Sequence, residues 1–195
     1  SVDGLELYMA NILDVHELRL GQAGLVLTDP PYEKQYLTLW GELIRFSNEV
    51  LVEHGWLLAM SGQRWLPDVF KQMEVAAEKT NMRYCWTLAI HTPGGLSAQG
   101  WISRRNSLNT EWKPVLVYSK GTPADWPSGF RDFIVSSGPS KEHHKWGQNS
   151  GVFKHMVEMF SEPGTLVCDP FLGGGTTAIA ARPTRAFEGF DVNKV

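Results

Sequence analysis

This sequence has few cysteines, no long apolar run and only a small excess of negative charge. Its 195 residues include two cysteines, Cys85 and Cys168, and both lie inside apolar segments. We therefore expect reduced core thiols of a cytosolic protein, which disfavours a disulfide framework and a metal site. No apolar run approaches the length of a membrane span, and no signal-peptide pattern opens the chain. The net charge of −3 excludes an overall polycation.

The composition is that of one compact domain. Apolar residues make up 43% of the chain and aromatic residues 11%, which excludes low-complexity disorder. A single domain spanning residues 1–195 can bury about two-thirds of its surface. No repeat or linker divides the sequence, so we expect one domain.

The charge is unevenly distributed along the chain. Residues 92–154 carry eight basic and four acidic side chains, a balance of +4, so the remaining residues carry −7. A basic middle within an acidic body is typical of a face that binds a polyanion. A solvated loop region would have the same composition.

The apolar pattern alternates between strand-like and helix-like segments. Helical spacing is found at residues 15–21, 36–53, 65–79 and 152–160, and a further helix opens at 176. Strand-like runs occur at residues 5–10, 24–29, 56–60, 83–91, 113–120, 165–169 and 186–192, and residues 121–150 look mostly irregular. This alternation predicts an α/β fold whose sheet is covered on both faces.

The first candidate site is the tetrapeptide Asp29-Pro30-Pro31-Tyr32, which follows an apolar strand. Ligands of open α/β sheets bind beyond the carboxyl ends of the strands. Two prolines make a rigid turn with outward carbonyls, and a carboxylate beside a carbonyl can accept both hydrogens of an exocyclic amine. The tyrosine could stack on the planar base that carries this amine. The alternative is an ordinary Pro-Pro turn.

The second candidate site is the glycine-rich turn at residues 169–177, DPFLGGGTT, which also follows an apolar strand. No lysine follows the last glycine, which argues against a P-loop, and the dinucleotide pattern G-x-G-x-x-G fails as well. A nucleoside cofactor without a triphosphate remains, with Asp169 available to an ammonium group. Asp191, at the end of the next strand, could accept both ribose hydroxyls. A purely structural glycine turn is the alternative.

In this order, VLTDPPY and VCDPFLGGGTT resemble two motifs of the amino-group DNA methyltransferases that use S-adenosylmethionine. The resemblance is to the permuted β group, in which the D-P-P-Y motif precedes the cofactor motif. YMANILDVHEL, HKWGQNSGVFKHMVEMF and AFEGFDV resemble three further family segments, so the likeness covers essentially the whole chain. It implies a single-domain, Rossmann-like methyltransferase fold with a mostly parallel sheet, helices on both faces and a circularly permuted motif order.

The resemblance also implies the residues of the site. Catalysis would fall to Asp29, Pro30, Pro31 and Tyr32. The chain departs from the family at Asn11, where an aspartate is usual, and at Gln148, where a lysine is usual. The implied residues for binding S-adenosylmethionine are Asn11, Asp29, His144, Lys145, Gln148, Asp169, Phe171, Gly173, Gly175, Thr176, Thr177 and Asp191.

The activity implied by the resemblance is methylation of the adenine N6 amine in double-stranded DNA, on a base rotated out of the duplex. The enzyme would be cytoplasmic and DNA-associated, from a prokaryote or a phage. Cytosine N4 methylation, RNA adenine methylation and a catalytically silent DNA-binding subunit remain as alternatives. Methylation of a protein glutamine is disfavoured by the motif order.

DNA recognition would fall to a small insertion at about residues 92–143. Its two loops, 92–111 and 121–143, carry the candidate DNA-binding residues Arg104, Arg105, Arg131 and Lys141. So small a surface should read a site of about four base pairs or fewer per subunit, because longer sites need more side chains at base edges. A homodimer would add a second surface.

Overall fold

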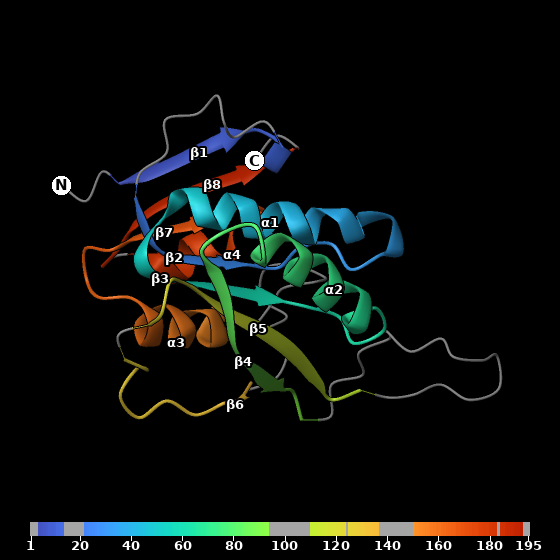
Figure 1. Ribbon diagram of the computed structural model, residues 1–195. Helices are drawn as coiled ribbons and strands as arrows, with labels where there is room; N and C mark the ends of the chain where they lie inside the picture. The colour runs from blue at the N-terminus through green and yellow to red at the C-terminus, as the bar shows by residue number, and fades with distance from the viewer. Residues whose placement is uncertain are drawn as a thin grey trace.

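The computed structural model describes residues 4–13, 22–93, 110–123, 125–136, 150–182 and 184–192. These residues form one sheet with the strand order β1-β8-β7-β2-β3-β5-β4-β6 (Figure 1). The strands are β1 (Leu5–Met9), β2 (Ala23–Thr28), β3 (Leu51–Met60), β4 (Met82–His91), β5 (Trp112–Lys120), β6 (Phe133–Val135), β7 (Leu166–Asp169) and β8 (Ala186–Asp191). The α/β fold expected from the sequence is confirmed.

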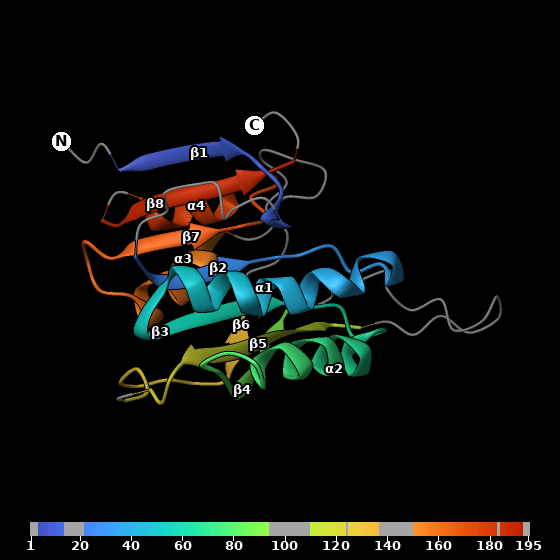
Figure 2. The ribbon, with the colours of Figure 1, turned by 45° about the horizontal axis from the view of Figure 1, so that its top comes forward.

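Helices cover both faces of this sheet. The helices are α1 (Leu37–Val50), α2 (Leu66–Ala77), α3 (Ser150–Phe160) and α4 (Thr176–Ala181), and a 3-10 turn, η2 (Lys34–Tyr36), precedes α1. Buried side chains of α1 and α2 form one core cluster with the sheet, and those of α3 and α4 form a second cluster. Figure 2 shows α1 and α2 together in front of the strands. The sheet is therefore the middle layer of three.

The sheet is mostly parallel, as expected. Only β5 among the described strands runs antiparallel, between β3 and β4. The carboxyl ends of the other strands consequently lie at one edge of the sheet. The chain leaves β2 through α1 on one face and leaves β7 through α4 on the other. β2 and β7 are neighbours, so the direction of winding reverses between them, and this switch point is where such sheets bind ligands.

The boundary between α1 and β3 differs from the sequence prediction. The apolar spacing predicted a helix over residues 36–53, whereas α1 ends at Val50 and β3 begins at the buried Leu51. Leu51 pairs with Ala23, and the register then shifts near His54, which has a φ of 65°. The apolar residues around position 51 fit both the helical and the strand periodicity. Pairing with β2 makes them a strand.

The stretch expected to be irregular contains a short strand. β6 pairs in parallel with the end of β4, so that Ile134 faces Ile90. Three residues are too few for a recognisable period. The run at 113–120, within the predicted recognition insertion, is β5 and lies inside the sheet. The helix predicted at 15–21 falls outside the described residues.

The described residues also bear on the cysteines and on membrane-spanning helices. Cys168 is buried and Cys85 is half-buried, and both are free thiols. None of the described helices is long and apolar enough to cross a membrane.

Candidate functional site

Asp29 lies directly after β2, where the strand is forced to end. Pro30 and Pro31 lack backbone N–H groups, so neither can donate to a continuing ladder. The Asp29 carboxylate is mostly buried, with 19% of its side chain exposed. The Tyr32 hydroxyl donates a hydrogen bond to Asp29 Oδ1. Lys113 Nζ lies 3.4 Å from Asp29 Oδ2 and forms an ion pair with it.

Burial and charge act in opposite directions on Asp29. Burial raises the pKa of this carboxyl above its usual range, because a desolvated carboxylate is costly. The charge of Lys113 and its hydrogen bond lower the pKa and favour the ionised form. Lys113 is therefore the group that offsets the cost of keeping a carboxylate at this position.

Lys113 is a site residue that the sequence reasoning missed. It belongs to β5, whose antiparallel direction brings the first residues of that strand to the edge where β2 ends. Its ammonium group also lies 5.0 Å from the centroid of the Tyr32 ring. The only signal in the sequence was a single lysine opening an apolar strand.

Asp169, at the end of β7, connects the ends of β2 and β7 through hydrogen bonds. Its Oδ1 accepts hydrogen bonds from the Thr28 hydroxyl at 2.6 Å and from the Phe171 backbone N–H at 3.0 Å. Its Oδ2 accepts one from the Thr177 hydroxyl at 2.5 Å. The side chain is 2% exposed, so it points into the protein. A direct contact of Asp169 with a ligand ammonium group stays a prediction.

The pKa of Asp169 is raised to about 6. Burial is the main cause, and the nearby Asp29 carboxylate raises the pKa further. The hydrogen bonds from Thr177, Thr28 and Phe171 act in the opposite direction. Two carboxylates thus lie close together at adjacent strand ends, each in a partly desolvated position.

The glycine-rich turn leaves open space beside its backbone. Gly173 and Gly175 have positive φ angles of 49° and 74°, which L side chains adopt only with strain. A Cβ added at Gly174 or Gly175 would meet no heavy atom within 4 Å. The Gly173 N–H donates to Asp191 Oδ2 at 2.9 Å, which joins this turn to the end of β8. The turn is thus shaped for the close approach of another molecule.

The segment after β1 completes this edge. Met9 pairs with Asp191, and the Ala10 N–H donates to the Asp191 carbonyl oxygen at 3.1 Å. Asn11 Oδ1 accepts the Leu13 N–H at 3.1 Å in a local turn. The strand ends thus place these predicted site residues at one edge of the sheet: Asn11, Asp29, Pro30, Pro31, Tyr32, Asp169, Phe171, Gly173, Gly175, Thr176, Thr177 and Asp191. His144, Lys145 and Gln148 lie outside the described residues.

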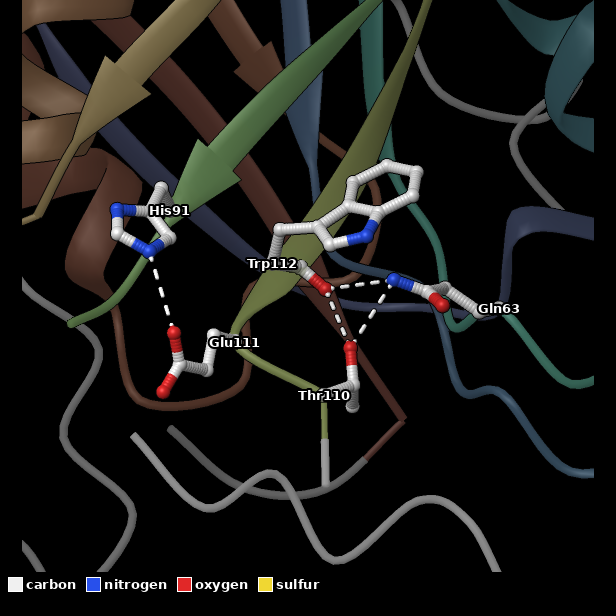
Figure 3. Close-up of polar contacts among 5 residues, drawn as sticks. All are labelled: Gln63, His91, Thr110, Glu111 and Trp112. Carbon is white, nitrogen blue, oxygen red and sulfur yellow. Dashed lines mark hydrogen bonds and ion pairs between the residues drawn. The ribbon is translucent and has the colours of Figure 1, made fainter. Parts of the chain in front are cut away.

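A cluster of polar contacts fixes the start of β5 at the same edge (Figure 3). Gln63 Nε2 donates to the Trp112 carbonyl oxygen at 2.8 Å and to Thr110 Oγ1 at 3.1 Å. The Thr110 hydroxyl also donates to the Trp112 carbonyl oxygen, at 3.0 Å. His91 Nε2 lies 3.5 Å from Glu111 Oε2. These contacts tie the ends of β4 and β5 to the segment after β3.

The predicted DNA-binding residues are not all placed by the structure. Arg104, Arg105 and Lys141 lie outside the described residues. Arg131 is exposed and precedes β6. β6 lies four strand spacings from β2, or about 19 Å across the sheet. Arg131 is thus not part of the cluster around Asp29.

Two further cations lie beside the site on segments that the sequence analysis did not select. Lys34 follows Tyr32 by two residues, and Arg64 belongs to the segment after β3. The Lys34 ammonium and the Arg64 guanidinium lie 5.4 Å and 5.1 Å from the centroid of the Trp65 ring. Both side chains are exposed. They form a basic pair next to the strand ends.

Comparisons with known proteins agree with this geometry. Residues 126–194 match a family model described as DNA methylase. The type II methyltransferase M.HpaI of Haemophilus parainfluenzae is 22% identical over an alignment 204 residues long, gaps included, that takes in 87% of this chain. The chain spans 64% of the length of that relative. Both matches are to DNA methylases.

Two solved structures are similar over nearly the whole chain. The M1.HpyAVI–SAM complex has a TM-score of 0.72 at 19% identity and covers 97% of this chain and 94% of its own. The PvuII DNA methyltransferase, described as cytosine-N4-specific, has a TM-score of 0.78 at 17% identity, with 97% and 82% covered. At these identities the likeness shows an α/β methyltransferase fold.

The raised pKa of Asp169 predicts a pH-dependent stability. The folded protein binds this proton more tightly than the unfolded chain, so the contribution of Asp169 to the free energy of unfolding falls as pH rises from about 4 to about 6. Relative to wild type, Asp169→Asn should gain up to about 3 kcal/mol between pH 4 and pH 7. Urea unfolding at both pH values measures the difference.

The matched control is Asp125→Asn, which changes an exposed aspartate. Its difference from wild type should be the same at both pH values. An equally constant difference for Asp169→Asn would contradict the prediction.

Proposed function

We propose that this chain transfers a methyl group from S-adenosylmethionine to the N6 amine of adenine in double-stranded DNA. The observation that carries the proposal is the position of Asp29 beside the open glycine turn, at the switch point between β2 and β7. A hydrogen-bond acceptor for an amine and a backbone cradle for a nucleoside cofactor thus lie on adjacent strand ends. The likeness to DNA methylases supports the same assignment.

The residues of the edge fit S-adenosylmethionine, which would supply an electrophilic methyl group when bound. The glycine turn has room for a ligand against its backbone. Asp191, held by the Gly173 N–H, is at the strand end where a carboxylate can accept ribose hydroxyls. Phe171 and Thr176 flank the turn. The similar M1.HpyAVI structure is itself a complex with this cofactor.

The chain's contribution to the reaction would be positioning. Asp29 and the Pro30 carbonyl would accept the two amine hydrogens and so direct the nitrogen lone pair toward the methyl group. Tyr32 would stack on the base, which must leave the duplex because its amine is otherwise paired. Asp29 accepts more hydrogen bonds, and stronger ones, when it is ionised, and in the free protein Lys113 favours that form. Such catalysis needs orientation and electrostatics but no nucleophile.

Cytosine N4 is the competing substrate, because its amine requires the same geometry. The PvuII enzyme, which is similar in fold, is described as cytosine-N4-specific. The aspartate at position 29 favours adenine, since the cytosine branch more often has serine there. Methylation of an RNA adenine would also fit the fold, as would a catalytically silent DNA-binding subunit. Tritiated methyl transfer to DNA and RNA, followed by digestion to nucleosides, distinguishes these outcomes.

DNA binding would combine the predicted arginines and lysine with the basic pair beside the site. Lys34 and Arg64 are exposed near the strand ends, where phosphates flanking an extruded base would pass. Arg131 lies farther along the sheet and would contact a more distant phosphate. The cytoplasmic location and a homodimer follow from the resemblance alone and remain part of the proposal.

Asp29→Ala should lower kcat by about 100-fold or more, because the amine loses an acceptor that orients it in the transition state. Affinity for S-adenosylmethionine should stay within a few-fold. Tritium transfer and calorimetry measure the two effects. Asp125→Ala, at an exposed position, is the control and should methylate normally. Near-normal methylation by Asp29→Ala would overturn the catalytic assignment.

The glycine turn can be tested with two matched substitutions. Gly175 and Gly164 have φ angles of 74° and 86°, and a Cβ at either position meets no heavy atom within 4 Å. Alanine at either position should therefore cost a similar 1–2 kcal/mol of stability, roughly. Only Gly175→Ala should lose affinity for S-adenosylmethionine, by about tenfold or more, because its methyl group fills the approach to the backbone.

Calorimetry with S-adenosylmethionine, ATP and NAD measures this difference. Equal cofactor affinity in Gly175→Ala and Gly164→Ala would show that the turn is only structural. Tight binding of ATP or NAD in place of S-adenosylmethionine would mean that the turn binds another nucleotide.

Salt dependence tests the DNA-binding residues. Each phosphate contact that is removed should reduce the slope of log K against log salt by about 0.9. The pair Arg104→Ala with Arg105→Ala and the pair Lys34→Ala with Arg64→Ala should each weaken DNA binding and flatten this slope. Cofactor affinity should not change. An unaltered slope in a pair would exclude that pair from the phosphate contacts.

A further inference from the structure

We propose that Lys113 is a positioning residue that occupies the place of the target base in the free protein and withdraws when the base enters. This inference rests on the proposed function and concerns the same site. The Lys113 ammonium lies 3.4 Å from Asp29 Oδ2 and 5.0 Å from the Tyr32 ring centroid. It therefore lies over one face of the Tyr32 ring while it is paired with the carboxylate.

A target base would need the same two contacts. Its amine would bond to Asp29, and its ring would stack at about 3.5 Å on Tyr32, where van der Waals contact is best. An ammonium group over that face leaves no room for a stacked base. The Lys113–Asp29 pair and the bound base are therefore alternatives, and entry of the base breaks the pair.

Lys113 also keeps the empty site ready for the base. The charged and titratable groups recorded around Asp29 include Tyr32 from its own turn, Lys113 from β5 and Asp169 from β7. Asp169 is a second carboxylate, and burial already disfavours a charge on Asp29. Without a cation, Asp29 would more readily take up a proton and could then accept fewer hydrogen bonds. Lys113 thus holds Asp29 in the form that the reaction requires.

The backbone around Lys113 is fixed, whereas its side chain can move. The preceding carbonyl, of Trp112, accepts hydrogen bonds from Gln63 and Thr110 (Figure 3). The following carbonyl, of Pro114, accepts the Ser61 N–H at 2.9 Å. The Lys113 side chain is 28% exposed, so its ammonium can leave along a flexible four-carbon stem without disturbing β5.

The test compares Lys113→Met and Lys113→Arg with wild type. In Lys113→Met the acidic limb of kcat/KM against pH should move up by about one unit or more, because an adjacent cation lowers a carboxyl pKa by that amount. The activity lost at pH 6.5 should largely return at pH 8.5. Lys113→Arg should keep the wild-type profile. Lys120→Met is the control, because Lys120 lies at the other end of β5 and donates to the Leu51 carbonyl oxygen.

A second readout uses the free protein without DNA or cofactor. NMR of carboxyl-labelled aspartate, assigned with Asp29→Asn, should show the Asp29 titration at higher pH in Lys113→Met than in wild type. This readout is independent of catalysis, so it tests the pairing even if the chain methylates no DNA. Equal Asp29 titrations in the two proteins would overturn the proposal.

DNA binding supplies the other decisive outcome. If Lys113 withdraws from the base site, Lys113→Met should bind DNA at pH 8.5 at least as tightly as wild type, with the same salt slope. A pH-independent loss of affinity with a flatter slope would show that Lys113 contacts a phosphate, and would overturn the proposal.

Discussion

The hydrogen bond from the Thr28 hydroxyl to the Asp169 carboxylate joins the two halves of the site. Thr28 is the last residue of β2 and Asp169 the last of β7, and the chain winds away from these two strands in opposite directions. Ligands of open α/β sheets bind where the winding reverses. The same carboxylate accepts the hydroxyl of Thr177 in α4, so one buried group sets the mutual position of the turn after β2 and the glycine turn after β7. Chemistry that needs one group from each turn depends on this contact.

The electrostatics of the site follow from the presence of several carboxylates at the carboxyl ends of neighbouring strands. Asp169 and Asp191 end strands there and Asp29 directly follows one, and each carboxylate has different partners. Asp169 accepts hydroxyl and backbone donors, and Asp191 accepts the Gly173 N–H. Asp29 faces a cation and a phenol. Burial raises the pKa of both Asp169 and Asp29; hydrogen bonds from neutral donors oppose this shift at Asp169, and the positive charge of Lys113 opposes it at Asp29. In the proposed reaction, the carboxylate that meets the substrate is thus the one whose partner can be exchanged.

Much of this arrangement could be predicted from the sequence, and the reasons are local. Residues 24–28 are mostly apolar, and Asp29 and two prolines follow them, so the strand and its end were predictable, as were β7 and the glycine turn. Parallel strands bring their carboxyl ends together, which placed Asp29, Asp169 and Asp191 at one edge. The partner of Asp29 could not be predicted, because Lys113 reaches it only through the antiparallel direction of β5. The end of α1 was misplaced because pairing of Leu51 with Ala23 is a non-local contact.

Strand β5 also anchors the segment that follows β4. The chain leaves β4 at His91 and returns to β5 through Thr110, and the Thr92 N–H donates to the Glu111 carbonyl oxygen at 2.7 Å. The two ends of the intervening segment are therefore held next to each other, where β4 ends and β5 begins. The entropic cost of closing a loop on fixed ends grows only slowly with its length. Insertions or deletions between these two anchors would leave the pairing of β4 with β5 in place. Under the proposed function, a lineage could thus change this segment by length or sequence while the strand ends around Asp29 kept their pairing.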